Sequence, residues 1–397
     1  MQPVALSRYS VVNCLGAGKQ PTLAALRSRR SGLQPCTFEA ARLDTYVGQI
    51  PDDWLAPLDA ALAEFDCRNN RLAQLALRQD GFEDAVREAA LRYGTERIAV
   101  VVGTSTSGIL QTEIAYRHRD PLTGALPAQF RYATTHSPYA LAGFVQRYLA
   151  LRGPAVVVST ACSSSAKVFA SAARLLVAGV CDAAVVGGAD SLCLTTLYGF
   201  NSLQLLSPAR CRPFDVARDG ISIGEGAGFA LLERAETADA ATPFLLGVGE
   251  SSDAYHMSSP HPEGLGAKLA MQRALASAGL RPADIDYVNL HGTGTRSNDL
   301  SEGKALCAVF GNRTPASSTK GWFGHTLGAC GIQEAVVSLL AIEHGFIPGS
   351  ANTETVDPAI DIDYVVNNRP QAVERVMSNS FGFGGTNCSL VFGRVAR

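Results

Sequence analysis

Long apolar runs are missing from this sequence. No segment reaches the roughly 18 consecutive apolar residues that a membrane-spanning helix needs, and the most apolar stretch, 170–189, is interrupted by Arg174 and Asp182. That stretch is typical of a buried helix followed by a buried strand. Residues 1–12 also lack a basic segment followed by an apolar one, so we expect no signal peptide and a cytoplasmic location.

Net charge is also small. The 34 basic and 36 acidic side chains leave a formal charge of −2, so the bulk charge does not favour nucleic acid or an anionic membrane as a partner. Charged residues make up 18% of the chain and hydrophobic residues 47%, which favours a compact protein over a disordered one. With 397 residues, the chain can form one large core or two smaller ones.

Paired cysteine motifs and a dinucleotide-binding turn are absent as well. None of the ten cysteines forms a CxxC pair, so neither a zinc ribbon nor a dithiol redox site is expected. Most of the cysteines are instead expected to be small buried hydrophobic residues. No early strand leads into a GxGxxG turn with an acidic residue downstream, which leaves a dinucleotide oxidoreductase poorly supported.

Apolar strands alternate with helix-length segments along the chain, which is the pattern of a layered α/β protein. Two places share one layout, an apolar strand, a small-residue turn with a reactive side chain and a helix; they begin at Ala155 and Ile285. This layout predicts two related halves, 1–238 and 239–397, joined by an acidic, alanine-rich surface connection at 233–243. The expected strands are 98–102, 155–159, 183–186 and 285–290, with a hairpin of 228–232 and either 376–380 or 389–393; the expected helices are 69–93, 165–178, 266–278, 299–310 and 333–344.

Cys162 is the candidate nucleophile. It lies within STACSSSAK, between an apolar strand and a helix. The positive end of a helix dipole and unpaired backbone N–H groups favour a thiolate at such a position, and the same N–H groups can hold a developing oxyanion. The three serines that follow are small enough to leave room for a substrate and can cap the helix. A buried structural cysteine in a tight turn is the alternative interpretation.

Two histidines stand in glycine-rich turns. His291 opens HGTGT at the end of an expected strand, and His325 lies in KGWFGHTLGACG before a helix. A single histidine is more often structural than catalytic, but two in such contexts, in a chain with only seven, favour a function. Lys320 lies five residues before His325 and, taken alone, is typical of a solvated surface lysine.

These motifs together resemble the elongating β-ketoacyl-[acyl-carrier-protein] synthases of the thiolase superfamily. TACSSS is similar to the nucleophile motif of that family. Five further segments appear in the family's order: CRPFDVARDGISIGEGAG, DAYHMSSPHPEG, HGTGT, SSTKGWFGHTLGACG and NSFGFGGTN. One short glycine motif is weak evidence, whereas five in order around a matching nucleophile are specific. The resemblance covers roughly residues 98–393.

The resemblance implies a fold and a reaction. The fold is a thiolase-like, five-layered αβαβα arrangement of two pseudo-repeated halves. The reaction is a ping-pong decarboxylative condensation, in which Cys162 takes up an acyl group as a thioester and malonyl carrier then supplies two carbons to give a 3-oxoacyl carrier. His291 and His325, as neutral imidazoles, would stabilise the enolate oxygen without a metal. The backbone N–H groups of Cys162 and Phe383 would form the oxyanion hole.

The resemblance also assigns supporting roles. Lys320 would be a buried site lysine paired with Glu334. Thr293 and Thr295 would bind the pantetheine arm of the carrier, although loop-stabilising threonines are an equal alternative from the sequence alone. Phe383, in GFGG, would be a gate at the acyl pocket, with core packing as its alternative.

The resemblance further implies the partners of the chain. No metal or organic cofactor is expected beyond the phosphopantetheine arm that the acyl carrier protein brings. The carrier would dock on a basic patch, for which Arg210 and Arg212 are candidates. A homodimer is implied, and a heterodimer with a chain-length factor is the alternative assembly.

Competing functions remain from other classes. A non-catalytic chain-length factor typically lacks the nucleophile, which this chain has. A thiolase needs a second reactive cysteine in a CxG setting, and Cys388 is followed by Ser389 and Leu390. The initiating ketosynthases lack the KGxxGH segment, which this chain has. Departures from the family pattern at Asn13 and across 32–69 leave the pathway open between bulk fatty-acid synthesis and specialised polyene or polyketide-like lipid synthesis.

Overall fold

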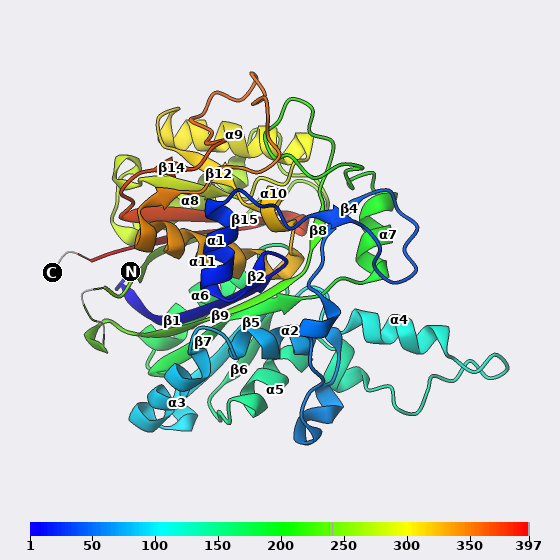
Figure 1. Cartoon of the computed structure of the whole chain (residues 1–397). Helices are drawn as coiled ribbons and strands as arrows, with labels where there is room; N and C mark the ends of the chain where they lie inside the picture. The colour runs from blue at the N-terminus through cyan, green and yellow to red at the C-terminus, as the bar shows by residue number, and fades with distance from the viewer. Residues whose placement is uncertain (238, 240, 396–397) are drawn as a thin grey trace.

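The computed structural model describes residues 1–237, 239 and 241–395, and its main feature is an eleven-stranded sheet (Figure 1). The sheet runs through β12, β11, β15, β16, β10, β1, β9, β7, β5 and β6 in that spatial order, with β2 added beside β1. The strands of the first half are β1 (Val4–Asn13), β5 (Ile98–Gly103), β6 (Ala155–Val158), β7 (Ala183–Asp190) and β9 (Gly226–Arg234); those of the second half are β10 (Phe244–Ser252), β11 (Tyr287–Leu290), β12 (Ala316–Ser318), β15 (Arg375–Gly382) and β16 (Thr386–Gly393).

The strand order repeats itself in the two halves. If the five strands of each half are numbered along the chain, both halves have the spatial order third, second, fourth, fifth, first. The two half-sheets meet through β1 and β10, which pair only at Val4 with Leu245 and at Ala5 with Phe244. This short junction lets the two half-sheets face each other across a shared layer of helices.

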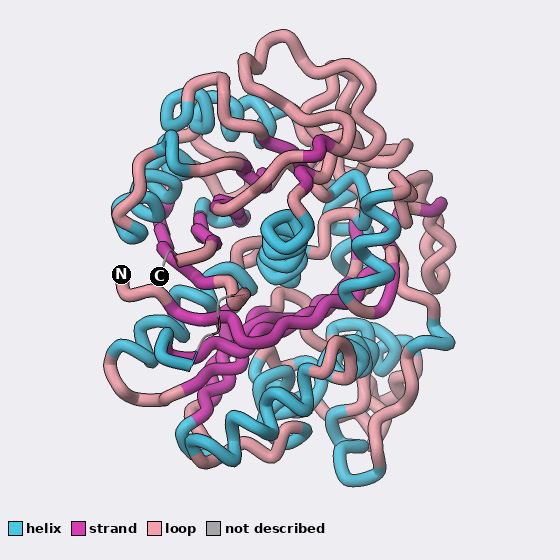
Figure 2. The backbone as a smooth tube through the Cα atoms, turned by 60° about the vertical axis from the view of Figure 1, so that its left-hand side comes forward, coloured by secondary structure: helices cyan, strands magenta, loops and turns pink. Residues whose placement is uncertain are grey.

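Helices form three layers around the two half-sheets. α6 (Ser164–Val177) and α11 (Cys330–His344) pack together between the half-sheets, and Figure 2 looks along this central layer. The outer layers are α2 (Arg68–Leu77), α3 (Phe82–Tyr93) and α5 (Tyr139–Tyr148) on the first half, and α8 (Leu265–Ala278) and α9 (Arg296–Phe310) on the second. The expected five-layered αβαβα fold is confirmed.

The remaining elements are short or peripheral. The other helices are α1 (Lys19–Arg27), α4 (Ile109–Arg117), α7 (Leu194–Ser202) and α10 (Lys320–Phe323), and the other strands are β2 (Gly16–Ala17), β3 (Gln34–Pro35), β4 (Tyr46–Gly48), β8 (Ile223–Gly224), β13 (Phe346–Ile347) and β14 (Arg369–Pro370). None of the helices in the described ranges is long and apolar enough to cross a membrane.

The composition of α11 explains its central position. All its residues from Cys330 to Ile342 are buried, because small and apolar side chains surround the whole helix rather than one stripe. Its polar members in this stretch are satisfied internally: Gln333 bonds Asn13 and the backbone of β1 and β9, Glu334 pairs with Lys320, and the hydroxyl of Ser338 donates to the carbonyl of Glu334. Asn13 therefore ties β1 to the central helix.

Most expected elements are confirmed within a few residues, but two expectations are wrong. The helix expected at 69–93 is two helices, since Asp80 and Gly81 both adopt positive φ (58° and 69°) between α2 and α3. The expected hairpin is also wrong: β9 pairs with β1 and β7, whereas β15 and β16 pair with each other. Period-two patterns identify strands but carry no information about their partners. Ala238, at the expected boundary between the halves, lies outside the described residues.

The central helices approach each other closely at Gly331. A Cβ on this glycine would lie 2.3 Å from the backbone nitrogen of Ala166 in α6. We therefore expect Gly331→Ala to force the helices apart and to lower the free energy of unfolding by about 1–3 kcal/mol, measured by chemical or thermal denaturation. The matched control is Gly199→Ala in α7, where nothing lies within 4 Å of an added Cβ. Equal stability of the two variants would contradict this account of the helix contact.

Candidate active site

A cavity opens where the two halves meet. The first half contributes Cys162 from the turn after β6, and the second half contributes His291 from the end of β11 and His325 from the turn before α11. All three are buried, with 2–6% of each residue exposed. Phe200, Leu205, Ile221, Thr293, Thr295, Phe381 and Phe383 are among the other lining residues.

The structure brings the three expected reactive side chains together. One ligating atom of each, the sulfur of Cys162 and a ring nitrogen of each histidine, lies within 4.8 Å of the other two. The two imidazole rings are perpendicular, with centroids 5.5 Å apart. A single thioester carbonyl bound at the sulfur would therefore be within reach of both rings.

Cys162 lies in a sharp turn between strand and helix. Ala161 adopts positive φ (51°), and the side chains of Ser163 and Ser164 bond back to the backbone of Thr160 and Ala161. Such a conformation is unfavourable for alanine and persists only where the surroundings fix it. The turn places Cys162 two residues before the first residue of α6.

The resting thiol of Cys162 is protonated. Burial raises its pKa to about 11, although the Lys320 ammonium and the backbone N–H of Phe383 favour the thiolate. The expectation of an ionised sulfur at the head of the helix is therefore wrong for the free protein, because burial outweighs the groups that favour the charge.

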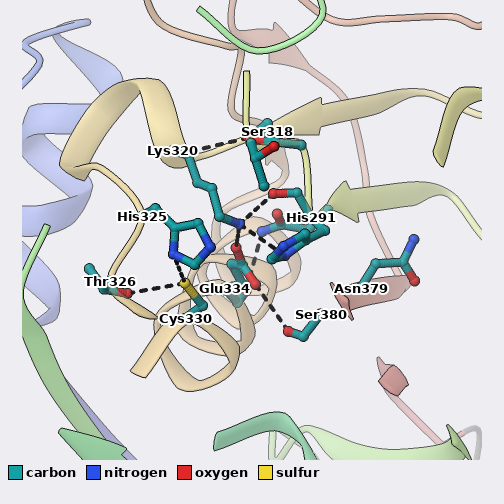
Figure 3. A network of polar contacts seen from close by, with 12 residues as sticks. His291, Ser318, Lys320, His325, Thr326, Cys330, Glu334, Asn379 and Ser380 are labelled. Carbon is teal, nitrogen blue, oxygen red and sulfur yellow. Dashed lines mark hydrogen bonds and ion pairs between the residues drawn. The ribbon is translucent and has the colours of Figure 1, made fainter. Parts of the chain in front are cut away.

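Lys320 fixes the tautomer of His291. Its ammonium group donates to the carbonyl oxygen and to Nδ1 of His291, the latter over 3.2 Å, and to Glu334 (Figure 3). Since an ammonium group has only protons to offer, Nδ1 of His291 must accept, and the ring proton resides on Nε2. Burial, Lys320 and His325 all lower the pKa of His291 well below its usual value, so this ring is neutral.

His325 has the same tautomer for a different reason. The backbone N–H of Leu327 donates to its Nδ1 over 3.0 Å, so Nδ1 is again the acceptor and Nε2 carries the proton. Burial and Lys320 lower the pKa of His325 well below its usual value. Both rings are therefore neutral N–H donors on the side that is not occupied by Lys320 or Leu327.

These tautomers decide what the cluster can hold. One cysteine and two histidines at this spacing are a common ligand set for zinc. A metal bound through Nε2 would need the lone pair of that nitrogen, so the ring proton would have to be on Nδ1. There it would face the donor group of Lys320 or Leu327, which needs an acceptor. The geometry thus favours an anionic oxygen between the rings over a cation.

Lys320 and Glu334 form a fully buried ion pair, as the resemblance implied. Burial alone would lower the pKa of Lys320, but the contact with Glu334 raises it above the usual value. The second carboxylate oxygen of Glu334 accepts from Ser380 over 3.2 Å. With both charges satisfied, the pair acts as a rigid support beneath His291.

Thr293, Thr295 and Phe383 also line the cavity. The hydroxyl oxygens of the two threonines lie 2.9 Å apart, so both face the same side of their loop. The ring of Phe383 packs on Phe200 with centroids 5.6 Å apart, and Gly384 and Gly385 beside it both have positive φ (80° and 75°). Among the expected docking residues, Arg210 bonds the carbonyl of Leu33 and stacks over Tyr46.

Three buried carboxylates that position the site were missed from the sequence. Glu302 accepts the backbone N–H groups of His291 and Gly292, and Asp299 accepts those of Thr293 and Gly294. Burial raises the pKa of Glu302 to about 7. The carboxylate of Asp190 accepts hydrogen bonds from the 104–106 turn and from the backbone N–H of Gly328, three residues after His325. A charged residue within an otherwise small-residue segment is the available signal, as for Asp190 in GGAD.

The raised pKa of Cys162 gives a testable pH dependence. Because only the thiolate reacts with iodoacetamide, the rate of alkylation at Cys162 should rise about tenfold per pH unit from pH 7 to 10. Peptide mass mapping would separate this site from Cys307, which is exposed. A rate that levels off below pH 8 would show that the free protein already holds a thiolate.

Comparisons with known proteins identify the family. Residues 1–238 match the beta-ketoacyl synthase N-terminal domain, and residues 244–354 match the beta-ketoacyl synthase C-terminal domain. Nodulation protein E of Rhizobium meliloti (strain 1021) is 38% identical over 332 residues, 81% of this chain and 80% of that protein. A 3-oxoacyl-[acyl-carrier-protein] synthase 2 of Coxiella burnetii is 33% identical and covers 99% of this chain and 98% of its own.

Comparison with solved structures points to the same family. A chain in the structure of the ketosynthase (ApeO) in complex with its chain length factor (ApeC) from Xenorhabdus doucetiae is 38% identical, with a TM-score of 0.89 and coverage of 99% and 98%. A beta-ketoacyl synthase from Burkholderia phymatum is 30% identical with a TM-score of 0.86. The chain therefore belongs to the β-ketoacyl synthase family. It is an acyltransferase that forms carbon–carbon bonds.

Proposed function

We propose that this enzyme condenses an acyl group, held on Cys162, with malonyl carrier to give a 3-oxoacyl carrier. The observation that carries the proposal is the convergence of one thiol and two neutral imidazoles within 4.8 Å. The family and the names of the relatives, among them 3-oxoacyl-[acyl-carrier-protein] synthase 2, support the same reaction.

In the loading step, Cys162 attacks the acyl thioester of the first carrier. Lys320 and the backbone N–H of Phe383 favour the thiolate that attacks. The tetrahedral oxyanion is held by the backbone N–H groups of Cys162 and Phe383. When the carrier thiol leaves, it takes the proton that Cys162 lost, so the step needs no net proton transfer to a base.

In the condensation step, malonyl carrier loses carbon dioxide and leaves an enolate. The Nε2–H groups of His291 and His325 donate to the enolate oxygen, which gains negative charge as carbon dioxide departs. The enolate carbon attacks the thioester carbonyl on Cys162, and the sulfur leaves as a thiolate that regains a proton from solvent. Lys320 and Glu334 support His291 throughout.

The carrier and its arm account for the rest of the cavity. Thr293 and Thr295 face one side of their loop and can hydrogen-bond a pantetheine arm. Phe383 closes the acyl side against Phe200, and the glycines beside it permit the loop to move. No cofactor other than the carrier's own arm is needed for this chemistry. The pathway is either fatty-acid or specialised lipid synthesis.

We further propose that the chain assembles through β6. Within the described part of the sheet β6 pairs only with β5, so its outer edge is open, and Val156 on it is 38% exposed. An open edge favours pairing with a strand of another chain. A homodimer is proposed, with a chain-length factor as the alternative partner, since related structures contain one. The halves 1–238 and 239–397 are proposed as its two structural units.

The proposal is tested by separating the two steps. Cys162→Ala should take up no acyl group from acyl carrier, as measured by intact mass. His291→Ala and His325→Ala should load normally but condense 10²–10³-fold more slowly, the typical cost of one oxyanion donor. Exposed His256→Ala is the matched control, and this variant should load and condense at the native rates.

A loaded Cys162→Ala variant, or full condensation in either site histidine variant, would refute these assignments. A panel of acyl carriers of different chain length and unsaturation, tested with the native enzyme, would identify the pathway. A preference for polyunsaturated chains would favour the specialised one.

A further inference from the structure

Cys330 is a second buried thiol at the reaction centre. It is the first residue of α11 and is 1% exposed, and its sulfur lies 3.1 Å from Nδ1 of His325 (Figure 3). The condensation described above assigns it no role. Of the ten cysteines, it and Cys162 are the two in direct reach of the site histidines.

The surroundings of Cys330 set the direction of its hydrogen bond. The hydroxyl of Thr326 donates to the sulfur over 3.6 Å, which leaves the S–H proton free for another acceptor. Nδ1 of His325 is that acceptor, and it shares its one lone pair between the S–H of Cys330 and the N–H of Leu327. Burial raises the pKa of Cys330 well above its usual value, so the thiol keeps its proton at physiological pH.

The two site histidines are supported unequally. Nδ1 of His291 receives a charged donor, Lys320, which is itself fixed by Glu334. Nδ1 of His325 receives a backbone N–H from Leu327, whose own φ is +53°, an unfavourable conformation for leucine. Donation by Cys330 to the same nitrogen therefore restrains the His325 ring further, because the first donor, Leu327, depends on a strained backbone.

We propose that Cys330 is a positioning residue for the condensation: its S–H, donated to Nδ1 of His325, holds that ring as the Nε2–H tautomer facing Cys162. The inference rests on the proposed role of His325 as a donor to the enolate. It names no new reacting group, because Cys330 acts only through the imidazole.

The proposal has a definite pH signature. His325 is faced by Lys320 from α10, His291 from the end of β11, Cys162 from the turn before α6 and Cys330 from α11, with Glu334 behind Lys320. A donor on Nδ1 stabilises the neutral ring, since protonation would place a second proton there. Removing the donor raises the pKa of His325, so the acid limb of the condensation rate should move to higher pH.

Cys330→Ala and Cys330→Ser form the test, with loading and condensation measured separately on the full-length enzyme. Alanine removes the donor, and condensation should slow about 3–10-fold, the worth of a modest hydrogen bond, with unchanged loading and an acid limb at higher pH. Serine keeps a donor and should restore the rate to within about threefold and the acid limb to its native position.

Cys193→Ala is the matched control, because Cys193 is also buried and its sulfur also contacts a threonine hydroxyl, that of Thr196, yet it touches neither site histidine. Condensation by Cys330→Ala equal to that of Cys193→Ala, or no rescue by serine, would overturn the proposal. If the alanine variant does not fold, a tenfold loss in the serine variant would overturn it instead. Failure of the proposed function itself would be seen in a different result, namely full condensation by the His325→Ala variant.

Discussion

The buried contact of Lys320 with Glu334 and His291 is the interaction on which the site depends. An ammonium group without exposure is costly unless a carboxylate compensates its charge, and here Glu334 compensates it while the remaining protons are used on His291. The charged pair thereby determines which ring nitrogen of the neutral His291 carries the proton. It also supplies positive potential near Cys162, in a cavity where burial disfavours the thiolate.

Positioning is shared between the two halves of the molecule. The nucleophile comes from the first half and both donors come from the second, and buried carboxylates on neighbouring elements hold the turns that carry them. Glu302 and Asp299 fix the 291–294 loop from α9, and Asp190 fixes Gly328 from β7. The backbone amides of these turns are thereby paired even though the turns belong to no regular element.

The sequence predicted the elements and the reactive residues better than the connections among them. Strands such as 98–102 and helices such as 266–278 follow from local periodicity, and the motif order pointed to Cys162, His291, His325 and Lys320. The break at Asp80 and Gly81 was missed although an Asp-Gly dipeptide is itself a turn signal. The partner of β9 and the roles of Glu302 and Cys330 depend on contacts between segments far apart in the chain, which periodicity does not encode.

The close packing of Gly331 on Ala166 has a consequence for how this enzyme can diversify. These residues lie six positions after His325 and four after Cys162, so the contact fixes the separation of donor and nucleophile from within the helical layer. No larger side chain fits at that crossing, and the reacting atoms cannot be moved apart to suit a longer substrate. Adaptation to a new acyl group must therefore occur in the cavity wall, at positions such as Phe200, Leu205 and Ile221, while the spacing of the chemistry stays constant.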